Sequence, residues 1–418
     1  MDALKITGRK TLSGVISVSG SKNATLPIVT AALLSDGTSI LRNAPELADV
    51  QTLCRVIEHA GAMTSRYDDE LRIDGSRVDR PEAPYDWVRR MRASFLVLGP
   101  LLARFGHARV SLPGGCAIGA RPVDQHLKAF KKMGAAIELD AGYVVASAPQ
   151  GLQGAEIDFD MPTVGGTENV MLAASLARGT TIIRNAAREP EIADLAKALR
   201  SMGAKITGDG MSEIVIEGSS SLAPFDHRVM ADRIEAGTYA VAGALVGHDL
   251  TVQGFEIASQ QALIDVLEAL GAQYRLGDGC LTLSKIEHGH PVEVVTGPFP
   301  EFPTDMQAQL MALMTQIEGV SSITETIFEN RFMHVAELSR LGAEIAINGP
   351  VASVFGPRRL SGTAVMATDL RASASLVLAA LAAEGETIIR RIYHLDRGYT
   401  DLEKKLQAVG ACVERVEG

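Results

Sequence analysis

A glycine- and proline-rich stretch carries the cysteine best placed for chemistry. Residues 112–122 read LPGGCAIGARP and show neither helical nor alternating periodicity, so they predict an exposed loop. Free cysteine is usually buried, and an exposed thiol beside a cation is the arrangement that makes a thiol reactive. We therefore predict a chemical role for Cys116, with Arg121 as the neighbouring cation. The alternative is an inert loop cysteine.

Two further segments combine a helix start with a charged side chain. Residues 19–23 (SGSKN) lie between a predicted strand and a predicted buried helix, so a helix N-terminus and Lys22 converge on an anion site. The spacing does not match a Walker A loop, and a solvated lysine is the alternative. Asp305 begins another helix, where it fits a capping residue first and a general base second.

Four arginines stand at the junctions of predicted elements: Arg92, Arg331, Arg371 and Arg397. An R-A-S triplet begins at both Arg92 and Arg371. Guanidinium groups bind carboxylate and phosphate through paired hydrogen bonds. The set predicts a polyanionic ligand, and the alternative for each arginine is an ordinary surface salt bridge.

The elements that must position these residues come from an internal repeat. A Gly-Ala pair ends a charged amphipathic segment six times, at spacings of 73, 69, 68, 71 and 68 residues. A second glycine opens a β-branched run with a similar period, as at Gly179. Two independent markers with one period predict six structural repeats. The first markers are Gly61, Gly134, Gly203, Gly271, Gly342 and Gly410.

Each repeat has the pattern β-α-β-α-β-β. In the third repeat, a strand at 155–159 precedes a helix at 170–177 that is apolar nearly all round and is therefore expected to be buried. A Thr/Ile strand follows, then an amphipathic helix over 191–202 that Gly203 ends, then a pair of strands. The sixth repeat is truncated, whereas a surplus strand at 4–7 precedes the first, so the N-terminus is expected to pair with the last repeat.

We therefore predict an α/β fold of two globular domains, each of three repeats, joined by a hinge that the chain crosses twice. One domain is 22–229 and carries the Cys116 loop. The other combines 1–21 and 230–418 and carries Asp305, Asp369 and Arg397. The cleft between two domains is the usual place for a ligand.

Composition narrows the classes of function. The 418 residues contain 40 Lys and Arg and 50 Asp and Glu, a net charge of −10, which argues against a nucleic-acid partner. The apolar stretches fall well short of the ~20 residues that span a bilayer, and no signal peptide is evident, so a cytoplasmic protein without a membrane partner is expected. The cysteines have no metal-site spacing, and Cys54, Cys280 and Cys412 are expected in the core.

The combined motifs resemble the enolpyruvyl transferases and, among them, the UDP-N-acetylglucosamine 1-carboxyvinyltransferases of peptidoglycan synthesis. The similarity runs the whole length of the chain. The family fold is two inside-out α/β globules of three repeats each, which agrees with the sixfold repeat. The resemblance rests on GSKN (20–23), MRAS (91–94), LPGGCAIGARPVD (112–124), FPTDMQAQ (302–309), FENRFMH (328–334) and DLRAS (369–373).

The resemblance implies transfer of the enolpyruvyl group of phosphoenolpyruvate to the 3-hydroxyl of UDP-N-acetylglucosamine. Phosphate leaves by addition and elimination through a tetrahedral ketal, in the first committed step of peptidoglycan synthesis. The reaction needs no cofactor, no metal and no obligatory protein partner. Cys116 is implied as the acid for the methylene carbon, as the site of a phosphoenolpyruvate adduct and as the target of fosfomycin. Asp305 matches the base for the sugar hydroxyl, and Asp369 matches an orienting group or proton acceptor.

The resemblance also assigns the substrate contacts. Lys22, Arg121 and Arg397 match contacts to phosphoenolpyruvate, with Arg92, Arg331 and Arg371 in support. Some members carry a lysine where Met161 stands here, which leaves no lysine at that point for the diphosphate. The implied nucleotide-sugar contacts are Asn23, Arg92, Arg121, Pro122, Val123, Asp124, Gln125, Thr163, Val164, Gly165, Asp305 and Ile327.

Two other functions fit part of the sequence. The sister enzyme of aromatic biosynthesis, 3-phosphoshikimate 1-carboxyvinyltransferase, shares the repeats and the basic cleft but does not rely on a cysteine acid. Six α/β units would also be compatible with a non-catalytic repeat scaffold. The acidic balance and the non-repeating Cys116, Asp305 and Arg397 disfavour the scaffold.

Overall fold

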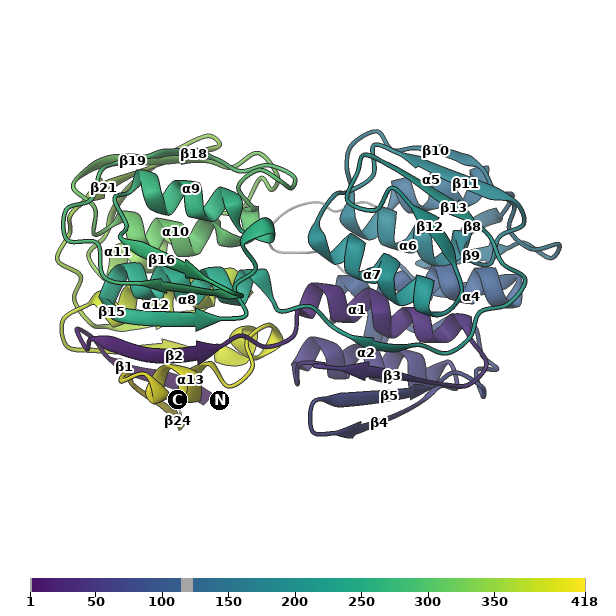
Figure 1. Ribbon diagram of the computed structural model, residues 1–418, viewed down its shortest axis with the longest axis horizontal. Helices are drawn as coiled ribbons and strands as arrows, with labels where there is room; N and C mark the ends of the chain where they lie inside the picture. Colours follow the sequence, from purple (N-terminus) through teal and green to yellow (C-terminus); the bar gives the residue numbers. More distant parts are fainter. Residues whose placement is uncertain (1, 114–122, 418) are drawn as a thin grey trace. The chain divides into compact units, whose positions relative to one another are not determined.

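The computed structural model describes residues 2–113 and 123–417, and these residues form two compact units (Figure 1). The inserted unit comprises residues 20–113 and 123–230. The split unit comprises residues 2–19 and 231–417. Among the described residues, no helix is long and apolar enough to cross a bilayer.

The inserted unit contains three repeats. Its elements are α1 (Lys22–Ala31), η1 (Ala32–Leu34, a 3₁₀ turn), β3 (Thr38–Arg42), α2 (Ala48–His59), β4 (Met63–Tyr67), β5 (Glu70–Asp74), β6 (Glu82–Ala83), α3 (Tyr85–Val88), η2 (Arg92–Val97), α4 (Leu98–Phe105), β7 (His107–Ser111), α5 (Asp124–Lys132), β8 (Ala136–Asp140), β9 (Tyr143–Ser147), β10 (Glu156–Asp158), α6 (Val164–Ala174), β11 (Thr180–Arg184), α7 (Pro190–Ser201), β12 (Lys205–Thr207), β13 (Glu213–Glu217) and β14 (Asp226–Arg228).

The split unit contains the other three repeats. Its elements are β1 (Asp2–Thr7), β2 (Leu12–Ser17), α8 (Arg233–Val246), β15 (Gly247–Gln253), η3 (Ile257–Ser259), α9 (Gln261–Ala269), β16 (Tyr274–Gly277), β17 (Cys280–Leu283), β18 (Glu293–Val295), η4 (Thr304–Met306), α10 (Gln307–Met314), β19 (Gly319–Thr324), α11 (Val335–Arg340), β20 (Glu344–Asn348), β21 (Val351–Gly356), β22 (Ala364–Met366), α12 (Leu370–Ala382), β23 (Glu386–Arg390), η5 (Ile392–Arg397), α13 (Leu402–Ala408) and β24 (Cys412–Glu417).

The described residues form six four-stranded sheets, one for each repeat, and all six have the same topology. In the third repeat the order is β10-β11-β13-β12, with β10 parallel to β11 and the other neighbours antiparallel. In the inserted unit one sheet includes a strand from the far end of that unit's chain, and in the split unit two sheets do, because β2 also pairs with β15. Strand β14 lies parallel to β3, with Asp226 opposite Ile40, and completes the first repeat. Strand β1 lies between β23 and β24 and completes the sixth.

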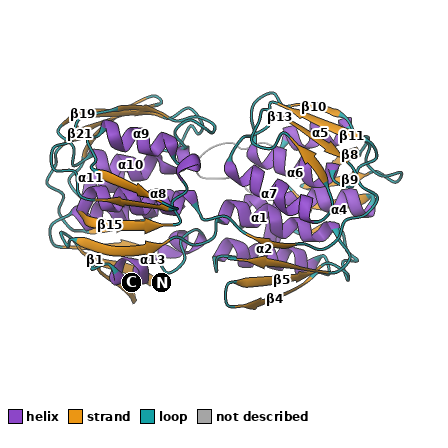
Figure 2. Cartoon of the chain, viewed as in Figure 1, coloured by secondary structure: helices purple, strands orange, loops and turns teal. Residues whose placement is uncertain are grey.

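The helices that lack a polar face are buried, as their sequences predict. All residues of α6 from Gly166 onward are buried, as is α12 from Leu370 to Leu381. In the split unit α8, α10 and α12 contact one another pairwise, and strands lie around these buried helices (Figure 2). This arrangement confirms the predicted α/β repeats, with helices rather than sheets at the centre of each unit.

The Gly-Ala marker of the repeat has a local structural cause. All six glycines adopt a φ between 89° and 110°, a region that favours glycine because it has no Cβ. The N–H of each following alanine donates to the carbonyl five residues earlier, at 2.9 to 3.1 Å. This is the Schellman pattern, which satisfies carbonyls at the end of a helix. The marker therefore ends the amphipathic helix in all six repeats.

The prediction for the cysteines outside the loop is partly wrong. Cys54 is buried, but Cys280 is half-buried and Cys412 is exposed. Side chains alternate between the two faces of a strand, and in β24 it is Val413 that points into the core. Recognising the strand did not settle which of its residues face inward.

Candidate active site

Most of the buried helices begin at a side-chain cap, and several site residues lie at these starts. In the described chain, the middle repeat of each unit departs from this rule, because the uncapped turns η2 and η4 precede α4 and α10. The N-terminus of a buried helix attracts anions because it has N–H groups without a partner in the helix and lies at the positive end of the helix dipole. The capping residues of α1, α6, α8 and α12 are Ser21, Thr163, Asp232 and Asp369.

In the split unit, two buried arginines form ion pairs with the carboxylate of Asp305. Arg331 Nη2 lies 2.8 Å from Oδ1, and Arg371 Nη2 lies 2.7 Å from Oδ2. Both guanidinium side chains are almost fully buried, whereas the Asp305 side chain keeps 27% of its surface exposed. Burial opposes ionisation of Asp305, but the charges of Arg371 and Arg331 outweigh it and hold the pKa of the carboxyl well below its usual range. Asp305 is therefore a charged group with an open side.

This geometry corrects two alternatives drawn from the sequence. Asp305 is not a helix cap: it lies inside η4, whose start makes no side-chain cap hydrogen bond. Arg331 and Arg371 do not form ordinary surface salt bridges, because each is only 6% exposed. A buried ion pair is a costly arrangement unless its members are well satisfied, so this triad indicates a specific role.

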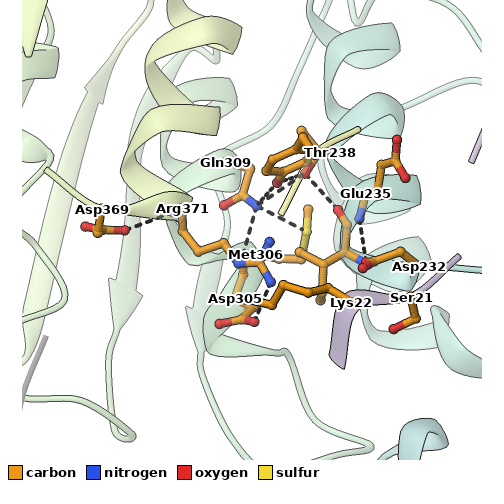
Figure 3. A network of polar contacts seen from close by, with 12 residues as sticks. Ser21, Lys22, Asp232, Glu235, Thr238, Asp305, Met306, Gln309, Asp369 and Arg371 are labelled. Carbon is orange, nitrogen blue, oxygen red and sulfur yellow. Dashed lines mark hydrogen bonds and ion pairs between the residues drawn. The ribbon is translucent and has the colours of Figure 1, made fainter. Parts of the chain in front are cut away.

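Asp369 lies next to this triad but has different partners. Its Oδ1 caps α12 by accepting from the N–H groups of Arg371 (2.9 Å) and Ala372 (3.0 Å). Arg371 therefore contacts both acidic residues, Asp369 through its backbone and Asp305 through its side chain (Figure 3). The starts of α10 and α12 are joined at this point.

A small hydrogen-bond network supports the turn that carries Asp305. Gln309 Nε2 donates to the Asp305 carbonyl at 2.9 Å and lies 3.3 Å from Thr238 Oγ1 and 3.5 Å from the Tyr399 hydroxyl. Tyr399 and Thr238 are themselves 2.9 Å apart. Figure 3 shows Gln309 and Thr238 beside Met306 and Asp305. The first turn of α10 is thereby connected to the second turn of α8.

Glu325 organises the other side of the same turn. Its Oε2 accepts from Thr304 Oγ1 at 2.7 Å, and its Oε1 accepts from the N–H of Ile327 at 2.8 Å. The buried Glu325 carboxylate therefore binds both the turn that carries Asp305 and the backbone of Ile327, a predicted site residue. Arg397, at the end of η5, is half-buried.

In the inserted unit, Lys22 is the first residue of α1 and follows the cap Ser21. Its Nζ lies 3.2 Å from Oδ2 of Asp49, near the start of α2. The Lys22 side chain is 12% exposed and that of Asp49 is 5% exposed, so the alternative of a solvated lysine is wrong. Asn23 follows in the same turn and is half-buried.

His126 connects the start of α6 with the surroundings of Arg92. The ring is buried, and its Nδ1 lies 3.1 Å from Asn169 Nδ2. Burial, with a smaller contribution from the charge of Arg92, lowers the pKa of His126 to about 3, so the ring is neutral. A Cβ added at Gly165 would lie 3.5 Å from the ring. The imidazole therefore lines the first turn of α6, which contains Val164 and Gly165.

The start of α5 is tied to the segment before α6. Gln125 Oε1 accepts from the N–H of Asp160 at 2.8 Å. Val123 is buried and Asp124 is exposed at the first turn of α5. A pocket of about 360 Å³ between α5 and β10 is lined by Gln125, Lys128, Ala129, Lys131, Lys132, Ile157, Asp158, Phe159 and Asp160.

In the split unit the structure brings Asp305 together with Arg331 and Arg371, and Arg371 with Asp369. In the inserted unit Lys22 pairs with Asp49, and Gly165 lies beside His126. Cys116, Arg121 and Pro122 lie outside the described residues. Sequence reasoning missed Asp49, Glu325 and His126, since a single polar residue gives no spacing signal. Gln309 could have been noticed, because it is one of two glutamines in the otherwise apolar helix α10.

The fold is that of the enolpyruvyl transferases. A sequence model of the EPSP synthase family (3-phosphoshikimate 1-carboxyvinyltransferase) matches residues 6–406. The crystal structure of the enolpyruvyl transferase NikO from Streptomyces tendae is similar over 100% of this chain and 99% of that one, with a TM-score of 0.90 and 30% identity. EPSP synthase from Acinetobacter baumannii has a TM-score of 0.77 with full coverage of both chains, and at 18% identity it supports the fold alone.

Sequence relatives define the family more closely. A UDP-N-acetylglucosamine 1-carboxyvinyltransferase from Anaeromyxobacter sp. (strain Fw109-5) is 57% identical over 419 residues, which cover 99% of each chain. One from Trichlorobacter lovleyi is 54% identical and covers 100% of this chain and 99% of its own. The chain belongs to the family of UDP-N-acetylglucosamine 1-carboxyvinyltransferases. The resemblance seen in the sequence is thereby confirmed, and the chain is a transferase rather than a scaffold.

Proposed function

We propose that the chain transfers the enolpyruvyl group of phosphoenolpyruvate to the 3-hydroxyl of UDP-N-acetylglucosamine and releases phosphate. The single observation that carries the assignment of residues is the Asp305 carboxylate, held by two buried arginines with one side open. A fixed carboxylate beside guanidinium groups suits a reaction in which a hydroxyl loses its proton next to anionic groups. The family's peptidoglycan reaction has this requirement.

In the split unit, Asp305 is proposed as the base for the sugar hydroxyl. The low pKa of Asp305 makes it a weak base. We therefore propose that it orients the hydroxyl and removes the proton as the new C–O bond forms. Arg331 and Arg371 fix both of its oxygens and add positive charge beside the substrate phosphate and carboxylate. Arg397 is proposed as a further contact to phosphoenolpyruvate, and Asp369 as an orienting group or proton acceptor.

In the inserted unit, Lys22 is proposed to bind phosphoenolpyruvate, with Asp49 fixing the direction of its ammonium group. Arg92 is proposed as a supporting charge. The first turn of α6, from Thr163 to Gly165, supplies N–H groups for the diphosphate of the nucleotide sugar. Met161 supplies no charge, which places more weight on those N–H groups. The other proposed nucleotide-sugar contacts are Asn23, Arg121, Pro122, Val123, Asp124, Gln125, Asp305 and Ile327.

The acid for the methylene carbon is proposed to be Cys116. A thiol with an ordinary pKa of ~8.5 is protonated at neutral pH and can still be activated by a neighbouring cation, here Arg121. The same thiol would form the phosphoenolpyruvate adduct and react with fosfomycin. The proposed domains are residues 22–229 and residues 1–21 with 230–418, and the enzyme is proposed to act in the cytoplasm.

The experiment that tests this function is a phosphate-release assay with phosphoenolpyruvate and each of two acceptors. We expect release with UDP-N-acetylglucosamine and none above background with shikimate 3-phosphate. The opposite preference would transfer the assignment to the sister enzyme of aromatic biosynthesis. Release with neither acceptor would contradict the proposal.

The role of Cys116 is tested with a matched cysteine control. Cys116→Ser should abolish turnover, while Cys412→Ser should retain it because Cys412 is exposed on the last strand. Fosfomycin should inactivate the Cys412→Ser variant as it does the unmodified enzyme. Full turnover by Cys116→Ser would remove the acid assignment.

A further inference from the structure

The carboxylate of Glu325 connects three segments of the split unit beside the turn that carries the proposed base. Glu325 is 5% exposed and directly follows β19. Its Oε1 accepts from Thr296 Oγ1 at 3.0 Å and from the N–H groups of Ile327 and Phe328 at 2.8 and 3.2 Å. Its Oε2 accepts from Thr304 Oγ1 at 2.7 Å. A buried polar group whose hydrogen bonds are all satisfied makes its surroundings rigid, so Glu325 forms a fixed junction.

Two other repeats have an asparagine at the same place, and it makes a different contact. Asn43 follows β3 and Asn185 follows β11, and each Nδ2 donates at 3.0 Å to the backbone carbonyl of the residue after the parallel neighbouring strand. In the fifth repeat that residue is Thr296, and its carbonyl accepts from Thr326 Oγ1 at 2.6 Å instead. The link between the two strand ends therefore does not depend on Glu325, whose longer carboxylate reaches other segments.

Those segments carry two proposed contacts to one substrate. Thr304 immediately precedes Asp305, the proposed base for the sugar hydroxyl, and Ile327 is a proposed contact to the nucleotide sugar. The two oxygens of Glu325 hold the Thr304 hydroxyl and the Ile327 N–H. A base acts efficiently only when the reacting hydroxyl is held at a fixed distance and angle from it. The separation of the two segments is therefore a quantity on which the reaction depends.

We propose that Glu325 is a positioning residue that sets the spacing between Asp305 and the backbone of Ile327, and so aligns the acceptor sugar with its base. This inference rests on the proposed function. Glu325 acts as a hydrogen-bond acceptor and exchanges no proton with the substrate. Because its contacts concern the acceptor, the binding of phosphoenolpyruvate, which is proposed to involve Lys22 and Arg397, should change little.

Two substitutions of Glu325 separate its length from its charge. In Glu325→Gln the amide oxygen can accept from the N–H of Ile327, and the amide nitrogen can donate to Thr304 Oγ1, so kcat and both KM values should stay within a few-fold of the unmodified enzyme. Glu325→Asp is one methylene shorter and cannot reach both segments. We expect kcat/KM for UDP-N-acetylglucosamine to fall by about 10²-fold in Glu325→Asp, with a higher KM for this substrate and little change in KM for phosphoenolpyruvate. Phosphate release with each substrate varied in turn measures these constants.

A third substitution tests whether Glu325 serves only the fold. Asn43 and Asn185 show that the repeat accepts asparagine at this place. Glu325→Asn should therefore fold with a small change in thermal midpoint, yet show the same kinetic loss as Glu325→Asp. A residue with only a structural role would lower the thermal midpoint and leave the kinetic constants of the folded protein unchanged, and that result would contradict the proposal.

The matched control is Glu403→Asp, which shortens another glutamate of the split unit. Glu403 lies in α13, its side chain is 12% exposed, and its Oε1 accepts from Arg415 Nε at 2.9 Å. This variant should keep kcat and both KM values. Unchanged constants in Glu325→Asp, an equal loss in Glu325→Gln and Glu325→Asp, or an equal rise in KM for both substrates would overturn the proposal.

A second pair of variants covers the case in which the Glu325 variants do not fold. Thr304→Val removes the hydroxyl that binds Oε2, whereas Thr304→Ser keeps it. Thr304→Val should raise KM for UDP-N-acetylglucosamine and lower kcat, and Thr304→Ser should match the unmodified enzyme. Equal constants in these two variants would overturn the proposal. Failure of the proposed function itself would appear separately, as absence of phosphate release by the unmodified enzyme.

Discussion

The starts of α10 and α12 use their acidic residues in different ways. Each begins a buried helix of the split unit and carries an acidic residue, Asp305 or Asp369, and Arg371 contacts both. Asp369 satisfies the backbone N–H groups of its own helix. Asp305 leaves its helix uncapped and binds two guanidinium groups instead. Asp369 therefore stabilises its own helix in addition to its proposed role, whereas Asp305 holds a charge that its helix does not need.

The difference shows where the repeat has been modified for chemistry. Capped starts recur in both units, as at Ser21, Thr163 and Asp232. The uncapped starts occur in the middle repeats and carry Arg92 and Asp305. A departure from a repeated stabilising device is unfavourable for folding, and such departures are expected to concentrate at functional sites.

The largest effect is expected from Asp305→Asn. The amide cannot balance the two buried guanidinium groups, so we expect a loss of about 3–5 kcal/mol in the free energy of unfolding. Loss of the base should lower kcat by about 10²- to 10⁴-fold. Urea unfolding at pH 7 and phosphate release measure the two effects. A fully stable Asp305→Asn protein would show that the triad does not depend on the charge.

Asp369 should allow its cap to be separated from its chemistry. Asp369→Asn keeps a good cap and should cost only a few tenths of a kcal/mol, whereas Asp369→Ala should cost about 1 kcal/mol. Both should lose kcat by about 10²-fold or more if the carboxyl takes part in proton transfer. Equal activity of Asp369→Asn and the unmodified enzyme would reduce Asp369 to a cap.

The pH dependence of stability should report Asp305. Because its folded pKa is depressed, its charge contributes stability that is present above the unfolded value of about 3.9 and is lost as the pH falls further toward the folded value. The stability gap between the unmodified protein and Asp305→Asn should therefore be constant from pH 7 to about 5 and narrow on further acidification. Asp86→Asn, at a side chain that is 82% exposed, should show no such gap.

The smallest effect is expected at the network behind Asp305. Tyr399→Phe removes the hydroxyl that lies 2.9 Å from Thr238 Oγ1 and 3.5 Å from Gln309 Nε2. We expect a loss of about 1 kcal/mol in stability, with kcat lowered only a few-fold. Thermal unfolding and phosphate release check this. A loss of kcat as large as that of Asp305→Asn would mean that the network takes part in the chemistry directly.

The sequence predicted the repeats because their markers have local causes. The Gly-Ala pairs end helices through their own φ and hydrogen bonds, and apolar helices must be buried wherever they lie. Partners far apart in the sequence were not predictable in this way. Nothing in the spacing of Asp305, Arg331 and Arg371 shows that they form a triad, and Asp305 was interpreted as a cap because local pattern cannot report a distant guanidinium. The same reason hid the pair formed by Lys22 and Asp49.

The strand β1 has a consequence for the order of events during synthesis. The inserted unit has all its strands once residue 230 has been translated, because β14 completes its first sheet. The split unit cannot close its last sheet until β24 leaves the ribosome and pairs with Asp2–Thr7, the first strand made. Strand β1 must therefore wait until residue 417 has been translated, whereas β2 can already pair with β15. We expect the inserted unit to fold first, with the edge of β1 kept unpaired until the chain is finished.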